Sequence, residues 1–180
     1  MGSHLIRRCG HTLGTVYGTR GIDYIRQRIS GFNNVADDNL YLALVDFMDT
    51  GKPCPGAIVE QWLPNRRAGM ILRLVVRELE SWLIADRQSL SKFLGVDITQ
   101  VPQHPERIDD PKKELVRLAR RSRRSSVRTA LVPAQNSTAQ VGPLYTSEMM
   151  RYIHNDWNAD EASVLAPSLA RCLDRLTRLS

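Results

Sequence analysis

Two pairs of carboxylates occupy positions in the chain that suit a hard metal ion. Each pair follows an apolar run of strand length, Asp46 and Asp49 after the first run and Glu78 and Glu80 after the second. Neighbouring parallel strands end at one edge of a sheet, and open α/β sheets bind their ligands there. Carboxylates gathered at that edge would hold Mg²⁺ or Mn²⁺, as a two-metal phosphoryl-transfer centre requires.

Each acidic pair also has a purely structural explanation. Aspartate is common where a strand passes into a turn, and acidic residues stabilise the first turn of a helix through its macrodipole. Glu78 and Glu80 share a face only if the backbone is still extended there. If a helix has already begun, the two side chains diverge and only one points into a site.

Lys112 is the candidate for stabilising negative charge. In the string Asp110-Pro111-Lys112-Lys113, Asp110 is a good N-cap and Pro111 suits the first helical position, so Lys112 lies at a helix N-terminus. This position favours anions, and a lysine there would bind a phosphate or stabilise developing charge. The alternative is an ordinary solvated lysine in a first helical turn.

The segment after Lys112 is basic, with Glu114 as its single acidic residue. We predict contacts with a nucleic-acid backbone from seven residues: Lys113, Arg117, Arg120, Arg121, Arg123, Arg124 and Arg128. No aromatic residue interleaves them, so we expect phosphate contact here rather than base stacking. A solvated helix face is the alternative explanation, although a face of one sign is less typical of it.

Composition limits the class of protein. The chain has 180 residues, a net charge of +6 and 42% hydrophobic residues, values that fit one globular domain and exclude a disordered or collagen-like chain. No apolar run is long enough to cross a bilayer, so we expect no membrane partner. The three cysteines, Cys9, Cys54 and Cys172, form no cluster and favour a reducing, cytoplasmic location.

Strands are expected early in the chain and helices late, which indicates the α/β class. We predict strands over 40–45 and 70–76, a long loop over 129–146, and a helix over 148–157. Other helices are expected over 22–29, 55–63 and 79–86, around Leu90, after Asp110, and along the C-terminal leucine stripe. Residues 1–4 resemble an expression-tag remnant, and 5–180 is expected to be one domain, with strands in 5–95 and mainly helices in 96–180.

Several of these strings together resemble one bacterial family. They are the strand end Leu44-Val45-Asp46-Phe47-Met48-Asp49, the string Arg77-Glu78-Leu79-Glu80-Ser81-Trp82-Leu83-Ile84-Ala85-Asp86, the string Asp110-Pro111-Lys112, and Val141-Gly142-Pro143-Leu144-Tyr145. From about Tyr17 to Leu179 the chain is similar to the Toprim-like domain-of-unknown-function family 4276. Its members are suspected nucleases related to those of overcoming-lysogenization-defect proteins.

The resemblance implies a Toprim-like fold, a small parallel or mixed sheet flanked by helices, that cleaves phosphodiesters with Mg²⁺ or Mn²⁺. It implies metal ligation by Asp46, Asp49, Glu78 and Glu80, with Glu80 and Lys112 in catalysis. Two features depart from the Toprim pattern. The first acidic pair is spaced Asp-x-x-Asp rather than Asp-x-Asp, and residues 5–45 contain no glutamate to match the usual first-strand glutamate. The chain then starts downstream of that strand, is catalytically degenerate, or uses another residue.

These observations favour a metal-dependent nuclease that acts on DNA or RNA, with a role in phage defence. A partner ATPase or another defence protein is the expected protein partner. The alternative is a degenerate module that binds nucleic acid or a partner protein without cleaving. A third hypothesis is a homo-oligomer assembled through the C-terminal leucine stripe.

Overall fold

The two predicted strands pair in parallel. In this computed structural model, which describes residues 1–17, 21–47 and 54–179, β1 (Tyr41–Phe47) lies beside β2 (Met70–Val76). Their register places Tyr41 opposite Met70 and Phe47 opposite Val76. The α/β expectation is thus confirmed, while the Toprim topology remains a prediction. β1 runs past its predicted end, so Asp46 lies in the strand and not after it.

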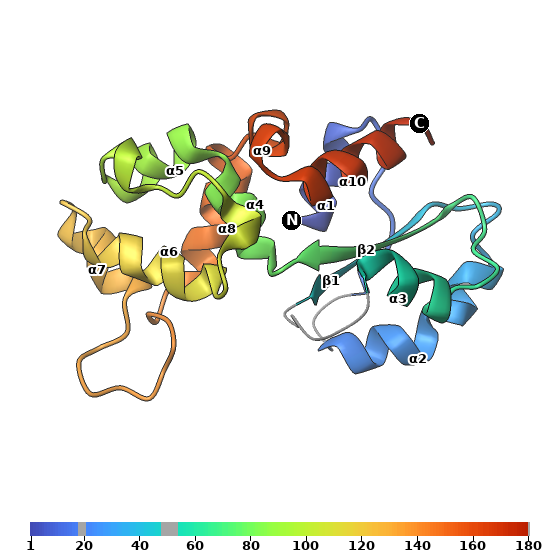
Figure 1. Ribbon diagram of the computed structural model, residues 1–180, viewed down its shortest axis with the longest axis horizontal. Helices are drawn as coiled ribbons and strands as arrows, with labels where there is room; N and C mark the ends of the chain where they lie inside the picture. The colour runs from blue at the N-terminus through green and yellow to red at the C-terminus, as the bar shows by residue number, and fades with distance from the viewer. Residues whose placement is uncertain (18–20, 48–53, 180) are drawn as a thin grey trace.

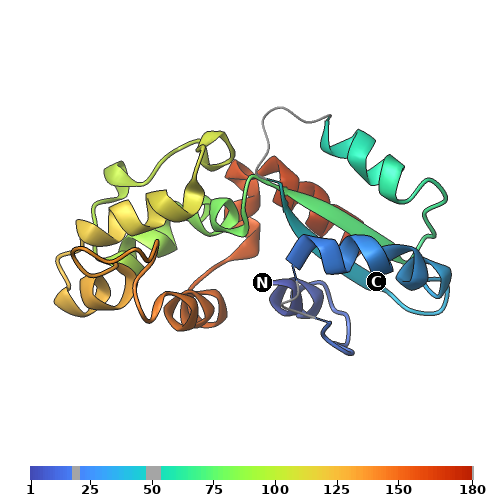
Figure 2. The same cartoon turned by 90° about the horizontal axis from the view of Figure 1, so that it is seen from below.

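Helices cover both faces of this small sheet (Figures 1 and 2). One face contacts α1 (Gly2–Arg8) and α10 (Pro167–Thr177), and the other contacts α2 (Gly21–Asn34) and α3 (Pro55–Trp62). Alternate residues of β2 point to opposite faces, as the pleat requires. Buried Ile71 and Val75 therefore join one hydrophobic cluster, while Met70, Leu72 and Leu74 join the other.

The second half of the chain is helical, as expected. It comprises α4 (Leu79–Ala85), α5 (Arg87–Leu94), the 3₁₀ turns η1 (Ile98–Gln100) and η2 (Pro105–Arg107), α6 (Pro111–Arg120), α7 (Ser125–Leu131), α8 (Tyr145–Asn155) and α9 (Ala159–Leu165). In Figure 1 these helices, α9 excepted, form a body to one side of the sheet, and β2 leads directly into it through α4.

Helix α4 is at the centre of the helical body. Trp82 is completely buried; its indole Nε1 donates to Ser168 Oγ over 2.8 Å, and its carbonyl accepts from Trp157 Nε1 over 3.0 Å. These bonds satisfy the polar atoms of a buried aromatic cluster. They also connect α4 to the start of α10, which covers the sheet, so the helical body and the sheet share one hydrophobic core.

Some predicted boundaries were wrong. The loop expected over 129–146 is shorter, because α7 continues to Leu131 and α8 already begins at Tyr145. The expected helix over 22–29 is part of the longer α2. Residues 2–4, set aside as a tag remnant, lie in α1, where the His4 ring is 5.4 Å from the ring of Trp157.

The C-terminal leucine stripe packs inside the chain. Leu169, Cys172 and Leu176 on α10 are fully buried, and Leu173 and Leu179 pack against the same cluster. The stripe thus does not present a free surface for the homo-oligomer that we hypothesised. Among the described residues, no helix combines the length and apolar character needed to cross a bilayer.

The close fit at Gly142 gives a stability prediction. A Cβ at Gly142 would lie 2.4 Å from the Ala130 carbonyl oxygen and 2.5 Å from the Leu131 carbonyl carbon, whereas a Cβ at Gly31 would meet nothing within 4 Å. We expect Gly142→Ala to lower the free energy of unfolding by about 1–3 kcal/mol. Gly31→Ala, in the middle of α2, should raise it by up to about 1 kcal/mol. Urea denaturation measures both, and equal stability of the two variants would contradict the packing.

Candidate active site

The two glutamates that follow β2 converge on one lysine. Glu78 is the extended N-cap residue of α4 and Glu80 lies in the first helical turn. Lys112 Nζ lies 3.3 Å from Glu78 Oε1 and 3.6 Å from Glu80 Oε1. The backbone changes from strand to helix between the two residues. For this reason, neither an extended segment nor a helix alone predicts that both carboxylates reach Lys112.

The N-terminus of α6 holds Lys112 in place. Asp110 is the predicted N-cap, and its Oδ1 accepts from the backbone N–H of Lys113 over 2.8 Å. Glu78 Oε2 accepts from the backbone N–H of Lys112 over 3.0 Å, which satisfies a second free donor of this turn. The carboxylate of Glu78 thus binds both the main chain and the side chain of Lys112. An Arg77–Asp109 ion pair of 2.8 Å joins the same two segments.

Asp46 reaches the same region from β1. Its Oδ1 accepts from the backbone N–H of Leu79 over 3.0 Å, so a strand residue caps the first turn of α4. Its side chain is open to solvent on one side, yet neighbouring protein atoms still displace water from it. This desolvation, together with the charge of Glu78, raises the pKa of Asp46. Asp49, the other predicted ligand of this pair, lies outside the described residues.

Burial and neighbouring charges shift the acid–base properties of the cluster. The side chain of Glu80 is only 12% exposed, and this burial raises its pKa despite the attraction of Lys112. Burial opposes the charge of Lys112, but attraction by Glu80 and Glu78 outweighs it and raises the pKa of the ammonium. At neutral pH the lysine is therefore a permanent cation beside the carboxylates.

Tyr145 belongs to the site, although we predicted no role for it. Its buried hydroxyl donates to Glu80 Oε1 over 3.2 Å, and burial raises its pKa, so it remains a neutral donor. Tyr145 begins α8 and is distant in sequence from Glu80. The only sequence signal was its place in the Val141–Tyr145 stretch of the family resemblance, which assigned it no function.

Few carboxylate oxygens of the site remain available to a cation. Among the described residues, no three His, Cys, Asp or Glu side chains are grouped to hold a metal ion. Mg²⁺, however, commonly binds through one or two carboxylates and retains several waters. Asp46 Oδ2 and Glu80 Oε2 accept no hydrogen bond from another described residue. These two oxygens are suitable ligands, whereas both oxygens of Glu78 already bind Lys112.

The predicted nucleic-acid-binding residues divide into two groups. Arg117 pairs with Glu114, Arg124 donates to the carbonyl of Phe93 in α5, and Arg128 donates to the carbonyl of Ser122 between α6 and α7. These three arginines have structural partners. The second group consists of exposed residues that form no ion pair with another described residue: Lys113, Arg120, Arg121 and Arg123.

The unpaired cations differ in their position relative to the site. Lys113 and Arg120 line a cavity that also includes Lys112, whereas Arg121 and Arg123 do not line it. Arg123 lies close enough to Asp97 to help lower the pKa of that carboxyl, after the larger effect of its hydrogen bonds with Thr99. The structure therefore connects only part of the basic segment to the site of Lys112.

Comparisons with known proteins assign neither a family nor a function to the chain. No protein-family model, curated protein or solved structure matches the chain. The family resemblance drawn from the sequence strings thus remains a prediction.

The raised pKa of Glu80 gives a pH-dependent stability prediction. A carboxyl whose pKa is raised on folding contributes stability below its unfolded pKa and loses it as pH rises through the folded value. Glu80→Gln keeps an oxygen for the Tyr145 hydroxyl but removes this titration. In metal-free buffer we expect the variant to be more stable than wild type at pH 8, with a difference that shrinks toward pH 4. Urea denaturation across this range tests it; a constant difference would contradict the role of Glu80.

Proposed function

We propose that the protein is a metal-dependent phosphodiesterase that hydrolyses nucleic acid at the cluster of Asp46, Glu78, Glu80 and Lys112. The observation that carries the proposal is the pairing of Lys112 with two carboxylates at the carboxyl edge of the parallel sheet. Acidic ligands for a divalent cation beside a lysine that binds phosphate are the groups that phosphodiester hydrolysis needs.

In this proposal each residue has a separate task. Asp46 and Glu80 would hold Mg²⁺ or Mn²⁺ through their free oxygens. When bound, the ion supplies an activated water and neutralises charge on the phosphate. Glu78 is a positioning residue, because its two oxygens hold the main chain and the ammonium of Lys112. Tyr145 likewise orients Glu80 by donating to Oε1.

Lys112 would bind the substrate directly. An ammonium has three N–H donors, and Glu78 and Glu80 use two directions, which leaves one for a phosphate oxygen. Its side chain is 35% exposed, in contrast to the nearly buried glutamates, so a substrate can reach it. Since its pKa is raised, it stays charged while negative charge develops on the phosphate.

Cleavage assays test the proposal. We expect purified protein to cleave a labelled DNA or RNA oligonucleotide only with Mg²⁺ or Mn²⁺. Asp46→Asn, Glu80→Gln and Lys112→Met should each lower the rate by about 10²-fold or more, as loss of a group that stabilises the transition state does. Arg178→Gln is the control: it removes an exposed positive charge from the C-cap of α10, far along the chain, and should leave the rate unchanged.

Metal titration provides an independent measurement. Isothermal titration calorimetry should detect Mn²⁺ binding in wild type and a weaker affinity in Asp46→Asn and Glu80→Gln. If neither the DNA nor the RNA oligonucleotide is cleaved with Mg²⁺ or with Mn²⁺, the proposed hydrolase activity is wrong. Nucleic-acid binding without turnover or metal binding would instead support the degenerate binding module.

A further inference from the structure

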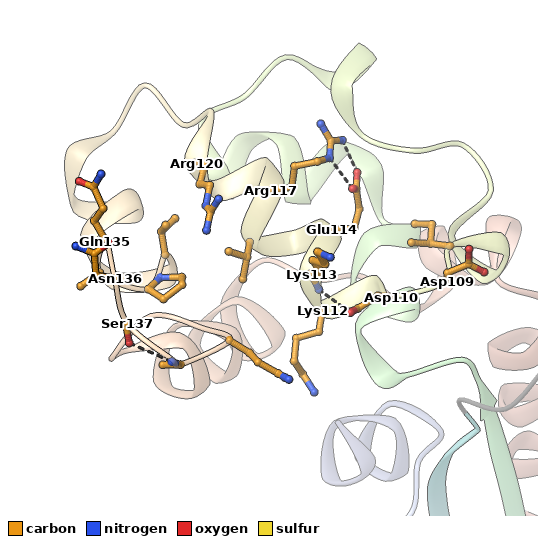
Figure 3. A pocket seen from close by; sticks show the side chains of 17 residues that line it. Asp109, Asp110, Lys112, Lys113, Glu114, Arg117, Arg120, Gln135, Asn136 and Ser137 are labelled. Carbon is orange, nitrogen blue, oxygen red and sulfur yellow. Dashed lines mark hydrogen bonds and ion pairs between the residues drawn. The ribbon is translucent and has the colours of Figure 1, made fainter.

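A cavity of about 1060 Å³ lies beside the carboxylate–lysine cluster. Its lining residues come from the start and length of α6 and from the segment 132–140, which we call the α7–α8 loop (Figure 3). Lys112 lines this cavity while its ammonium contacts Glu78 and Glu80. Lys112 is therefore shared between this cavity, which we call the α6 groove, and the proposed catalytic site.

The α6 wall of the groove, which we call the cationic wall, carries four cations and three carboxylates. The carboxylates are engaged, because Asp109 pairs with Arg77, Asp110 caps α6 and Glu114 pairs with Arg117. Lys113 and Arg120 project from α6, and no carboxylate of the described residues pairs with either (Figure 3). They are seven residues apart, which is about 10 Å along a helix axis. Arg117 lies between them but is bound to Glu114. Two free cations at this separation suit two non-adjacent phosphates of one strand better than a single compact anion.

The opposite wall carries neutral hydrogen-bonding groups. Gln135, Asn136 and Gln140 line it and are all exposed, with both donor and acceptor atoms in each amide. Figure 3 shows Gln135 and Asn136 on the loop across from the basic helix. Amides are the side chains that form paired hydrogen bonds with the edges of bases.

The shape of the α7–α8 loop is held by its own hydrogen bonds. At its base, the N–H of Gly142 donates to Leu131 O over 2.9 Å and that of Leu144 donates to Ala130 O over 3.0 Å. At its tip, Asn136 adopts a left-handed φ of 68°, a conformation that asparagine tolerates. These bonds fix the two ends of the second wall, which lowers the entropy cost of ordering it on binding.

Size selects the form of nucleic acid. The cavity volume of about 1060 Å³ is slightly above the roughly 300–1,000 Å³ of small-molecule sites, so it has room for a few nucleotides. Reading the bases of a duplex requires a protruding helix or ribbon that enters its groove, whereas this site is a hollow, which favours a single strand. No aromatic side chain of the described residues lines it, so amide contacts and phosphate pairing, rather than stacking, would hold the strand.

We propose that the α6 groove binds a single strand of nucleic acid, with its phosphates on Lys113 and Arg120 and its unpaired bases against Gln135, Asn136 and Gln140. This inference extends the proposed hydrolase and rests on it for the reaction. It adds a substrate class, an unpaired strand that leads to the phosphodiester at Lys112.

Fluorescence anisotropy in EDTA tests binding without any cleavage. The probes are labelled single-stranded DNA and RNA of about ten nucleotides and the same sequence as a DNA duplex. We expect a single strand to bind more tightly than the duplex. In the double variant Lys113→Gln/Arg120→Gln, the slope of log K against log[salt] should become shallower by about 0.7 for each lost contact. At 0.1 M salt, the loss of two contacts corresponds to an affinity about 25-fold weaker.

Two further variants complete the design. Gln135→Ala/Asn136→Gly removes two of the three amides of the opposite wall, and glycine preserves the left-handed backbone at 136. This double variant should weaken binding with an unchanged salt slope, because no charge is lost. Arg171→Gln/Arg178→Gln removes the same charge as the cationic-wall variant from exposed positions in α10 and at its C-cap, and should have little effect.

The outcomes separate this inference from the hydrolase. Tighter binding of the duplex would overturn the single-strand proposal even if wild type cleaves nucleic acid. The same would follow if Arg171→Gln/Arg178→Gln weakened binding as much as Lys113→Gln/Arg120→Gln. Lost single-strand affinity in the cationic-wall variant, without cleavage by wild type in Mg²⁺ or Mn²⁺, would support the α6 groove and overturn the hydrolase. Thermal melts that match wild type exclude unfolding as the cause of lost binding.

Discussion

The contact between Glu78 and Lys112 is the interaction on which the candidate site depends. One carboxylate at the end of β2 accepts from both the backbone and the side chain of a residue at the start of α6. It thereby holds the start of α6 at the sheet edge. Because Glu78 is nearly buried, loss of either partner would leave a polar group without compensation, which is far costlier than losing an exposed ion pair.

The site retains charged side chains at positions where neutral side chains would make the fold more stable. Glu80 is nearly buried and its pKa is raised, and Asp46 is shifted in the same direction. Each therefore destabilises the folded chain when ionised, although neutral side chains could accept the same hydrogen bonds. Such local destabilisation is common where function needs charged groups close together.

The fold was largely predictable because its elements have strong local signals. Apolar runs predicted both strands, and the Asp110-Pro111 pair predicted the start of α6 to the residue. Boundaries failed where tertiary contacts extend an element: β1 continues through Asp46, and α8 begins at Tyr145. The leucine stripe was correctly predicted as helical, but its partner was internal, since amphipathicity does not say which surface an apolar face meets.

The sequence by itself determined which residues carry charge and where along the chain they lie: Asp46, Glu78, Glu80 and Lys112 were all identified from it. Only the tertiary structure decided how they meet, because a change from strand to helix within three residues aims both glutamates at one lysine. It also added Tyr145 and separated the cations of the α6 groove from arginines that brace the backbone. Those distinctions depend on contacts between residues far apart in sequence, which no local pattern encodes.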